Sequence, residues 1–348
     1  MKSIGLYGKK DMVVERREVD IAEPGFNDAV VKVHACGVCG TDMNFLKQWS
    51  DDAMPLGHEI AAEVVAVGDG VSHVQPGDHV IVEDCAMCGL CDKCKGGRPD
   101  LCVSFYDLGG QSGMGQYMRV RCNNLVKYEG LSPVAACLTE PLAVSLSSVL
   151  QADVPLGGSV LVIGCGPLGL MSAKVAKLQG AGFVAATQIN TNSTLGKART
   201  ALAEKMGIDQ VIDAAQEDVE AVIKQRFPDG VDRVIVSAPP ESMHDALKAI
   251  AYGGIITFYG LHFGDRSRIE IDINHLIFRK ITLRPVFAEP AINFSVSLDL
   301  LKRGLIPAKD LVTHQVAPAE AEKVFHAIAD RTEPIIKAVV LPIGMNVG

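Results

Sequence analysis

The sequence predicts an α/β protein of two domains, one of them built on a doubly wound parallel sheet. Its 348 residues exceed the length at which one hydrophobic core usually stops growing, so we expect a domain boundary. From residue 158 to residue 284, short apolar runs typical of strands alternate with helix-length segments. This alternation is the order that produces a parallel sheet with crossover helices.

The composition limits the classes of partner. The chain is 48% apolar and 21% charged, as in ordinary globular proteins, and its formal net charge of −8 disfavours nucleic acid and anionic lipid. The first twenty residues contain no apolar segment of the signal-peptide kind. No run approaches the roughly 18 uncharged apolar residues of a membrane helix. We therefore expect a cytoplasmic protein that binds neither nucleic acid nor membrane.

A glycine pattern follows the first predicted strand of the sheet, in GSVLVIGCGPLGLMSAKVAKLQGAGFVAATQ (158–188). In a strand–turn–helix context, Gly164 allows the tight turn, Gly166 lets the backbone approach a pyrophosphate, and Gly169 lets the helix pack closely on the strand. The helix N-terminus would then face the phosphates of a dinucleotide. Further strands are expected at 210–213, 233–237, 254–259 and 280–284.

The end of the second predicted strand bears on the choice of coenzyme. Gln188 stands about where NAD enzymes of this fold carry an acidic residue that binds the ribose 2′-hydroxyl. Because no carboxylate is present to repel a 2′-phosphate, the sequence favours NADP, with NAD as the alternative. The polar segment QINTNSTLGKAR (188–199) is otherwise an ordinary surface turn before a helix. The residues expected at the coenzyme are Gly164, Gly166, Pro167, Leu168, Gly169, Gln188 and Asn190.

Five of the ten cysteines lie within CAMCGLCDKCKGGRPDLC (85–102). In a chain of this length without a secretory signal, clustered cysteines are more often metal ligands than disulfides. The spacing C-x2-C-x2-C-x7-C predicts a closed zinc site that holds a loop together, made by Cys88, Cys91, Cys94 and Cys102. An iron–sulfur cluster that includes Cys85 is the alternative, although the C-x3-C-P ending of ferredoxin-type runs is missing.

A second set of potential ligands lies in GVCGTDMNF (37–45) and PLGHEIAAEVVAVGDGV (55–71). Cys39, His58 and Glu59 offer a thiolate, an imidazole and a carboxylate, which is the mixed set of catalytic zinc sites that keep one position open. Taken singly, His58 is more often a hydrogen-bonded histidine and Cys39 a small buried hydrophobe. Together with the cysteine lobe, they predict a zinc-dependent enzyme.

These motifs resemble the zinc-containing medium-chain dehydrogenase/reductase family over nearly the whole chain. CGTD, GHE, the cysteine lobe, TEPLA (139–143) and GCGPLG occur in the order of that family, and the chain is most similar to its polyol and threonine dehydrogenase branch. In that branch the glutamate of the E-P-L motif, here Glu140, takes a zinc position that a cysteine fills in alcohol dehydrogenases. The resemblance implies a catalytic zinc held by Cys39, His58, Glu140 and, by exchange or through water, Glu59.

The resemblance also implies the domain arrangement. A mostly-β, GroES-like catalytic domain would comprise residues 1–151 and 286–348, with a Rossmann coenzyme domain at 152–285 inserted between them. Homodimers or homotetramers are implied as well. The segments that border the substrate pocket in this family contain Phe45, Trp49, Tyr106, Phe287 and Glu289.

The implied reaction is hydride transfer between a nicotinamide coenzyme and a secondary alcohol or ketone of a polyol, sugar or cyclitol. Thr41 is implied as the first proton acceptor. The family often carries a histidine five residues after the catalytic cysteine, but this position is Asn44, which cannot titrate near pH 7. Threonine, a simple alcohol or an aldehyde is the alternative substrate. An inactive binding or structural protein is the alternative of another class, disfavoured because Cys39, His58 and Glu140 are all present.

Overall fold

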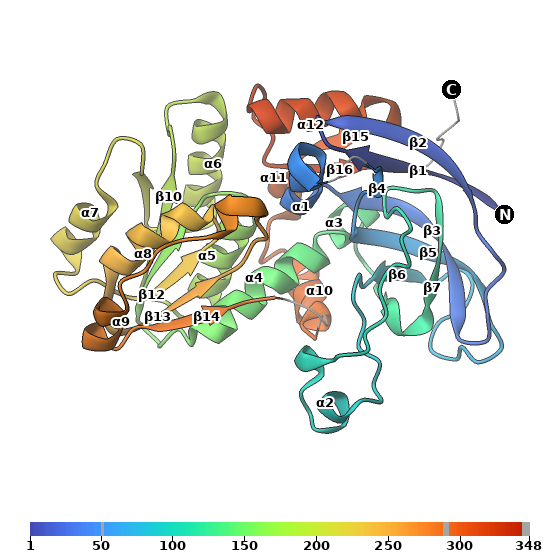
Figure 1. Ribbon diagram of the computed structural model, residues 1–348, viewed down its shortest axis with the longest axis horizontal. Coiled ribbons are helices and arrows are strands. Elements are labelled where there is room, and N and C mark those ends of the chain that lie inside the picture. The colour runs from blue at the N-terminus through green and yellow to red at the C-terminus, as the bar shows by residue number, and fades with distance from the viewer. Residues whose placement is uncertain (50–51, 288–291, 343–348) are drawn as a thin grey trace. The chain divides into compact units, whose positions relative to one another are not determined.

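The computed structural model describes residues 1–49, 52–287 and 292–342, and the chain forms two compact units (Figure 1). The catalytic unit comprises Met1–Ala143 and Ala288–Gly348, and the coenzyme unit comprises Val144–Phe287. The first boundary falls inside helix α4 (Thr139–Ala152), whereas the sequence places it at the end of that helix. The two differ because the first five residues of this helix group with the catalytic unit and the rest with the coenzyme unit, a division that sequence patterns do not reveal.

The coenzyme unit is built on a six-stranded sheet with the order β11-β10-β9-β12-β13-β14, in which every neighbouring pair is parallel. The chain starts in the middle of the sheet, proceeds to one edge and then continues to the other, so the sheet is doubly wound as predicted. All residues of β9 and β10 are buried, as expected for parallel strands covered on both faces. The strands are β9 (Ser159–Ile163), β10 (Phe183–Gln188), β11 (Gln210–Asp213), β12 (Val231–Val236), β13 (Ile250–Phe258) and β14 (Thr282–Pro285).

Helices alternate with these strands. Helix α5 follows β9 because Gly166 caps its N-terminus and Pro167 occupies its first turn, where a missing N–H costs nothing. It ends at Gly180, whose φ of 105° is readily adopted only without a Cβ. The helices are α5 (Pro167–Gln179), α6 (Thr194–Lys205), α7 (Val219–Arg226), α8 (Met243–Ala249) and α9 (Ile273–Arg279), with 3-10 turns at Pro240–Ser242 and Gly264–Ser267.

The catalytic unit is mostly β. Its larger sheet has the order β15-β16-β3-β5-β6-β8, with β7 also paired to β3, and a smaller sheet has the order β2-β1-β4. The strands are β1 (Lys2–Lys9), β2 (Val13–Asp20), β3 (Asp28–Gly37), β4 (Met54–Pro55), β5 (Glu59–Val67), β6 (His79–Val82), β7 (Tyr117–Arg121), β8 (Leu125–Lys127), β15 (Val312–Val316) and β16 (Lys337–Val340). The C-terminal strand β16 therefore lies directly beside β3, which precedes the CGTD motif.

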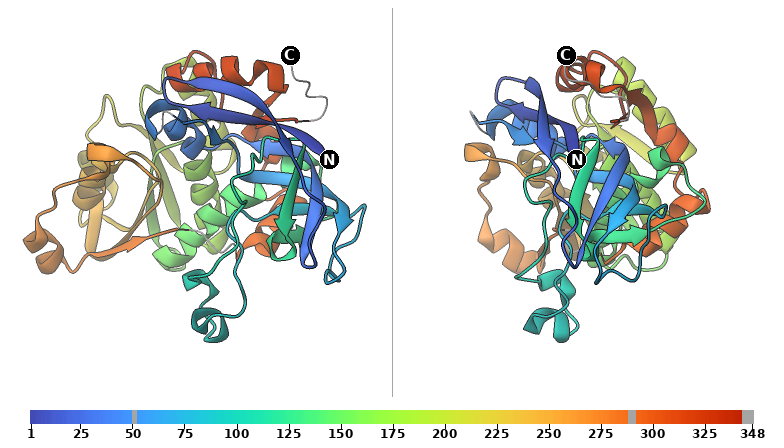
Figure 2. Two further views of the ribbon diagram at one scale, coloured as in Figure 1. Left: turned by 45° about the vertical axis from the view of Figure 1, so that its right-hand side comes forward. Right: turned by 90° about the vertical axis from the view of Figure 1, so that its right-hand side faces the viewer.

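Short helices connect and cover these strands. A loop that carries α2 stands out from the sheets of the catalytic unit in Figures 1 and 2. The helices are α1 (Gly40–Asn44), a π-helix (Phe45–Trp49), α2 (Asp92–Lys95), α3 (Pro133–Ala136), α4, α10 (Phe294–Lys302), α11 (Ala308–Leu311) and α12 (Ala321–Asp330), with 3-10 turns at Pro99–Leu101, Cys122–Asn124 and Pro318–Glu320. The loop with α2 is the one that contains the cysteine cluster.

The core of the catalytic unit fixes the strands that carry the candidate ligands. Val33 and Cys36 of β3, Ile60 of β5 and Phe325 of α12 are all fully buried in one apolar cluster. Because each such side chain is close-packed, the backbone between them has little freedom to shift. Residues at the ends of β3 and β5 are therefore held in defined positions.

One helical stretch, Pro133–Ala152, has the length and hydropathy of a membrane span. However, 67% of its apolar window is buried inside the protein, and it contains Glu140. The stretch therefore has the character of a core helix, although the sequence analysis did not anticipate a segment this apolar.

Candidate zinc and coenzyme sites

The cysteine lobe brings four sulfur atoms together, all within 4.8 Å of one another. The Sγ–Sγ distances are 3.5 Å between Cys91 and Cys94, 3.6 Å between Cys88 and Cys102, 3.9 Å between Cys91 and Cys102, and 4.0 Å between Cys88 and Cys94. A tetrahedral zinc with bonds of about 2.3 Å requires sulfur–sulfur edges of about 3.8 Å. The four cysteines therefore fit a closed zinc shell.

The backbone of the lobe favours thiolates. The amide groups of Leu90 and Cys91 donate to Cys88 Sγ, at 3.4 and 3.3 Å. Hydrogen bonds from the backbone lower the pKa of Cys91 to about 6, whereas burial and the neighbouring Cys91 raise the pKa of Cys94 to about 12. Four thiolates cannot coexist here without a cation, since each raises the cost of ionising the next. Cys85 is not among the four, and no cysteine of the chain, all ten lying in the described ranges, forms a disulfide.

A second group consists of Cys39, His58 and Glu59, whose ligand atoms also lie within 4.8 Å of one another. Cys39 caps the N-terminus of α1, His58 lies in the loop before β5, and Glu59 is the first residue of that strand. Burial alone would lower the pKa of His58, but Cys39 and other anionic neighbours raise it well above its usual value. The concentration of negative charge around one imidazole is the environment that a divalent cation neutralises.

Glu140 lies in the first turn of α4 and is 7% exposed. It is not within the 4.8 Å group, but its carboxylate is close enough to His58, Glu59 and Cys39 to interact electrostatically with each. Burial raises the pKa of Glu140 well above its usual value, and the carboxylates of Asp84 and Glu59 raise it further. A cation at this place would offset that cost, which makes Glu140 a fitting fourth donor.

Three residues that the sequence analysis did not single out belong to this site. Asp84 interacts electrostatically with His58 and Glu140, and it lies two residues after the apolar strand β6. Asp42 joins the backbone of Cys39 to that of Gly57. Lys337 of β16 forms an ion pair with Glu59. An acidic residue after a strand and a lysine within an apolar strand are signals that could have been noticed in the sequence.

Lys337 forms a buried ion pair with Glu59. Its Nζ lies 2.6 Å from Oε1 and 2.5 Å from Oε2, and it also donates to Val38 O at 2.9 Å. The Lys337 and Glu59 side chains are 2% and 0% exposed. Both buried carboxylate oxygens of Glu59 are therefore in contact with one ammonium group.

Thr41 and Asn44 occupy helix α1. The backbone N–H of Thr41 donates to Cys39 Sγ at 3.5 Å, so Thr41 lies next to the proposed ligand. Asn44 is the last residue of α1. The role of Thr41 as a proton acceptor stays a prediction.

The glycine loop of the coenzyme unit has the geometry that its sequence predicts. Gly164 has a φ of 105°, and a Cβ on Gly169 would lie 1.8 Å from Gly164 O, so the helix can approach the strand only without that side chain. The loop is further held by Gly164 N–H, which donates to Thr187 Oγ1 at 3.0 Å. Pro167 and Leu168 then begin α5, and the N-terminus of such a helix is suited to a phosphate, as the sequence predicts.

The residues after β10 are held by an unexpected carboxylate. Gln188 is 5% exposed and donates from Nε2 to Ile189 O at 2.7 Å. Asn190 has a φ of 54°, and its N–H donates to Asp213 Oδ1 at 3.1 Å, while Thr191 donates to Oδ2 from both N and Oγ1. Asp213 ends β11, the strand beside β10, so it organises the loop that the sequence analysis assigned to the ribose.

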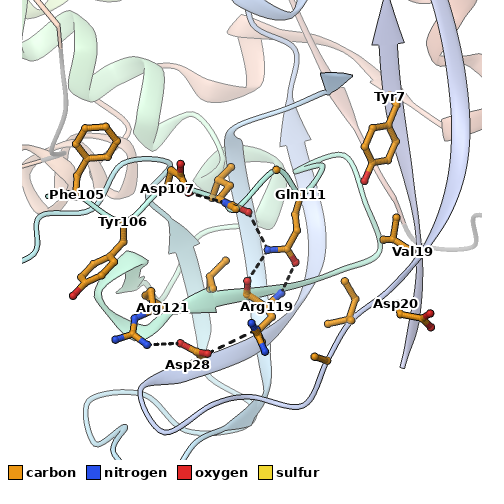
Figure 3. A pocket seen from close by; sticks show the side chains of 16 residues that line it. Tyr7, Val19, Asp20, Asp28, Phe105, Tyr106, Asp107, Gln111, Arg119 and Arg121 are labelled. Carbon is orange, nitrogen blue, oxygen red and sulfur yellow. Dashed lines mark hydrogen bonds and ion pairs between the residues drawn. The ribbon is translucent and has the colours of Figure 1, made fainter. Parts of the chain in front are cut away.

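A surface pocket of about 520 Å³ in the catalytic unit lies apart from these ligand residues, none of which lines it (Figure 3). In it Asp28 lies between Arg121, at 2.9 Å, and Arg119, at 3.7 Å, and the Arg121 guanidinium lies over the ring of Tyr106. Tyr106 therefore lines this surface pocket, which lies apart from the ligand residues. Phe287 is 67% exposed, Phe45 lies in the π-helix, and Glu289 and the side chain of Trp49 lie outside the described residues.

Two family models match the chain. The alcohol dehydrogenase GroES-like domain matches residues 25–130, and the zinc-binding dehydrogenase domain matches residues 167–303. The chain is 30% identical to the L-threonine 3-dehydrogenase of Vibrio cholerae, over 91% of this chain and 93% of that protein. It is 28% identical to the L-galactonate-5-dehydrogenase of Escherichia coli, over 95% of this chain and 96% of that protein.

The fold of the chain is also found among solved structures. A zinc-binding dehydrogenase from Sinorhizobium meliloti, solved with NADP bound, superposes with a TM-score of 0.84 at 27% identity, over 98% of this chain and 100% of that one. The domain matches, the full-length relatives and the two groups of ligand residues agree. This chain belongs to the zinc-binding medium-chain dehydrogenase family, in its threonine and polyol dehydrogenase branch.

Proposed function

We propose that this chain transfers a hydride between NADP and a secondary alcohol of a polyol, sugar or cyclitol-type substrate, at a zinc ion held by Cys39, His58 and Glu140. The observation that carries the proposal is the clustering of Cys39, His58 and Glu59 within 4.8 Å in a chain that also has a dinucleotide-binding glycine loop. As a zinc-binding dehydrogenase, the chain is an oxidoreductase. Only the substrate, the coenzyme and the residue roles are therefore proposed.

Each residue of the site has a separate proposed role in the reaction. When bound, zinc supplies Lewis-acid chemistry, which lowers the pKa of a hydroxyl group or polarises a ketone. Cys39, His58 and Glu140 would hold the ion, and Thr41, next to Cys39, would take the proton of the substrate hydroxyl. Because Asn44 cannot titrate near pH 7, the onward path of that proton differs from the histidine relay of other family members. Asp42 holds the backbone on either side of the ligands.

The substrate class rests on the relatives. The curated relatives include L-threonine 3-dehydrogenases and an L-galactonate-5-dehydrogenase, both named for oxidation at a carbon that carries a hydroxyl group within a polar molecule. Their names support a secondary alcohol with polar neighbours and keep threonine as the second candidate.

A substrate panel tests the proposal. Purified protein would be assayed by absorbance at 340 nm with polyols, sugar acids, cyclitols, threonine and simple alcohols, each with NADP and with NAD. We expect oxidation of a polyhydroxylated secondary alcohol, and no activity in a Cys39→Ser control. Turnover of threonine alone would favour the second candidate, and no turnover in wild-type protein that holds two zinc ions per chain would refute the proposal.

NADP is supported by two observations. Strand β10 of the coenzyme sheet ends in neutral Gln188. The neighbouring Asp213 carboxylate already accepts hydrogen bonds from Asn190, Thr191 and Ala215. The related zinc-binding dehydrogenase from Sinorhizobium meliloti was solved with NADP. Both support acceptance of a 2′-phosphate.

The chain is proposed to act as a cytoplasmic homo-oligomer. Strand β14 is an edge of the coenzyme sheet, and apolar side chains on the same unit are strongly exposed, at 61% for Ile273, 63% for Ile277 and 77% for Phe278. An uncovered edge strand and the exposed apolar side chains of α9 (Ile273–Arg279) are surfaces that a second copy can cover. Light scattering after size exclusion would test this, with a monomer at micromolar concentration as the refuting outcome.

The ten cysteines, none of which forms a disulfide, are consistent with the proposed cytoplasmic, reducing compartment.

A further inference from the structure

Lys337 is enclosed among residues of three adjacent strands. Glu59 begins β5, Gly37 ends β3, and Lys337 begins β16, in the sheet order β16-β3-β5. Gly37 pairs with Glu59 on one side and with Val339 on the other, so side chains at 37, 59, 337 and 339 share one face of the sheet. Lys337 must therefore cross the middle strand to reach Glu59.

Gly37 makes that crossing possible. A Cβ on Gly37 would lie 1.9 Å from Glu59 Oε2 and 3.1 Å from Lys337 Cε. The position without a side chain thus creates the space in which the two charged groups meet. The same Lys337 Nζ donates to Val38 O, one residue before the ligand Cys39. One ammonium group thereby contacts both Glu59 and the backbone that leads to Cys39.

The charges of the site suggest why the ammonium is present. Zinc held by Cys39, Glu140 and a neutral His58 carries no net charge, since one thiolate and one carboxylate balance the two positive charges. Glu59 is a further anion, and one of its carboxylate oxygens lies within 4.8 Å of Cys39 Sγ and of a His58 nitrogen. Without a partner it would complete the zinc shell and close the position that the substrate needs. Lys337 supplies that partner at 2.6 and 2.5 Å.

We propose that Lys337 is a positioning residue that holds Glu59 back from the zinc ion and so keeps the substrate position open, an inference that rests on the proposed function of this site. Lys337 neutralises Glu59 and contacts both of its carboxylate oxygens. Without that ammonium group, the Glu59 carboxylate would be free to approach the ion. Lys337 thus sets how strongly Glu59 competes with substrate.

Cobalt in place of zinc at the Cys39 site tests this inference without turnover. The visible bands of Co²⁺ respond to its coordination number, and imidazole binds to an open position of the ion. In the holoprotein with Co²⁺ at the Cys39 site, we expect Lys337→Met to raise the Kd of imidazole at least tenfold, because Glu59 then occupies the position. The same variant should lose Co²⁺ to EDTA more slowly than wild type. In steady-state assays KM should rise more than kcat falls.

Matched variants separate positioning from stability. Lys337→Arg keeps the charge and should bind imidazole nearly as wild type does. Lys127→Met removes another lysine of the same sheet, paired with Asp78 at 3.0 Å, and should leave the cobalt bands unchanged. In a Glu59→Gln background, Lys337→Met should have no further effect on imidazole, because its action passes through Glu59.

Three results would overturn the inference. The first is a Lys337→Met protein with wild-type imidazole affinity and cobalt bands but a lower Tm, which would make Lys337 purely structural. The second is a change of cobalt bands in Glu59→Gln alone, which would make Glu59 a resident ligand. The Glu59→Gln variant also tests the inference if Lys337→Met does not fold. The third is an effect of Lys337→Met that persists in the Glu59→Gln background. If wild-type protein takes up no Co²⁺ at the Cys39 site, the proposed function itself fails.

Discussion

Asp42 joins Cys39 to the loop that carries His58. Its Oδ2 accepts from Cys39 N at 2.9 Å and its Oδ1 accepts from Gly57 N at 2.8 Å, and the residue is 1% exposed. Two segments that each carry a proposed ligand are thus tied to one buried carboxylate. Such supporting contacts orient metal ligands and commonly change metal affinity 10–100-fold when they are removed.

Asp42→Asn should therefore impair the metal site without replacing a ligand. The amide NH₂ would face one of two backbone N–H donors, and an unsatisfied buried group costs about 1–3 kcal/mol. We expect kcat/KM to fall at least tenfold and the labile zinc to be lost faster to a chelator. Asp69→Asn, at an exposed position, is the matched control. Unchanged zinc retention in Asp42→Asn would show that the two segments are held by other contacts.

Cys39→Ser and Cys94→Ser should have opposite consequences. Elemental analysis of wild-type protein is expected to find two zinc ions per chain, one of them labile. Cys39→Ser should remove the labile ion and the activity while circular dichroism stays unchanged, because the cysteine lobe is an independent site. Cys94→Ser should lower Tm or cause aggregation, since a closed thiolate shell contributes directly to folding. Iron with visible absorbance, or one zinc ion in wild type, would contradict this assignment.

Gln188→Asp should reverse the coenzyme preference. Wild type is expected to have the higher kcat/KM with NADP, and the variant with NAD, because the new carboxylate would face a phosphate of nearly two negative charges. We expect the ratio of the two kcat/KM values to change at least tenfold. Gln210→Glu adds the same charge at the opposite end of the neighbouring strand and should leave the ratio unchanged. If the wild-type protein prefers NAD by tenfold or more, the loop after Gln188 must have a function other than binding a 2′-phosphate.

His34 should make the catalytic unit less stable in mild acid. Burial lowers the pKa of His34 below its usual 6.5, although Glu63, at 3.2 Å, partly opposes this. The folded protein therefore binds this proton less readily than the unfolded chain does. The associated stability is complete above about pH 6.5 and is lost as the pH falls through the lowered folded-state pKa.

His34→Gln should flatten that dependence. Between pH 7.5 and pH 5.5, Tm should fall about 2 °C further in wild type than in the variant, the shift that about 1 kcal/mol produces in a sizeable domain. His326→Gln, at an exposed position of α12, is the control. Parallel Tm curves for wild type and His34→Gln would contradict the expectation.

The features that could be predicted from the sequence are local ones. Gly164 and Gly169 act within six residues of each other, and Cys88, Cys91 and Cys94 lie in one short loop, so spacing alone constrains their geometry. The contacts of Lys337 and Asp213 depend instead on which strands become neighbours. Lys337 meets Glu59 only because β16, β3 and β5 are adjacent, and Asp213 meets Asn190 only because β11 lies beside β10.

Glu140 could be predicted neither from local spacing nor from strand order, but only from the resemblance to a family. Its residue type is ordinary for a helix N-terminus, where a carboxylate is favoured by the helix dipole, so nothing in its spacing from Cys39 identifies it. Resemblance to a family singled it out, and its burial near His58 then supports the assignment. The role of Asp42 is not evident from CGTD alone, because Asp42 binds backbone N–H groups rather than the proposed metal.

The partner of Glu59 is synthesised 278 residues after it. A nascent chain emerging from the ribosome therefore exposes Cys39, His58 and Glu140, and then the whole coenzyme unit, before β16 exists. Until β16 pairs with β3, Glu59 has no ammonium group and the end of β3 at Cys36 and Gly37 has no partner strand on that side. Closure of this long-range pairing is expected to be a late step in folding. Translation that stops before residue 337 would leave a polypeptide able to capture zinc yet unable to keep its substrate position free.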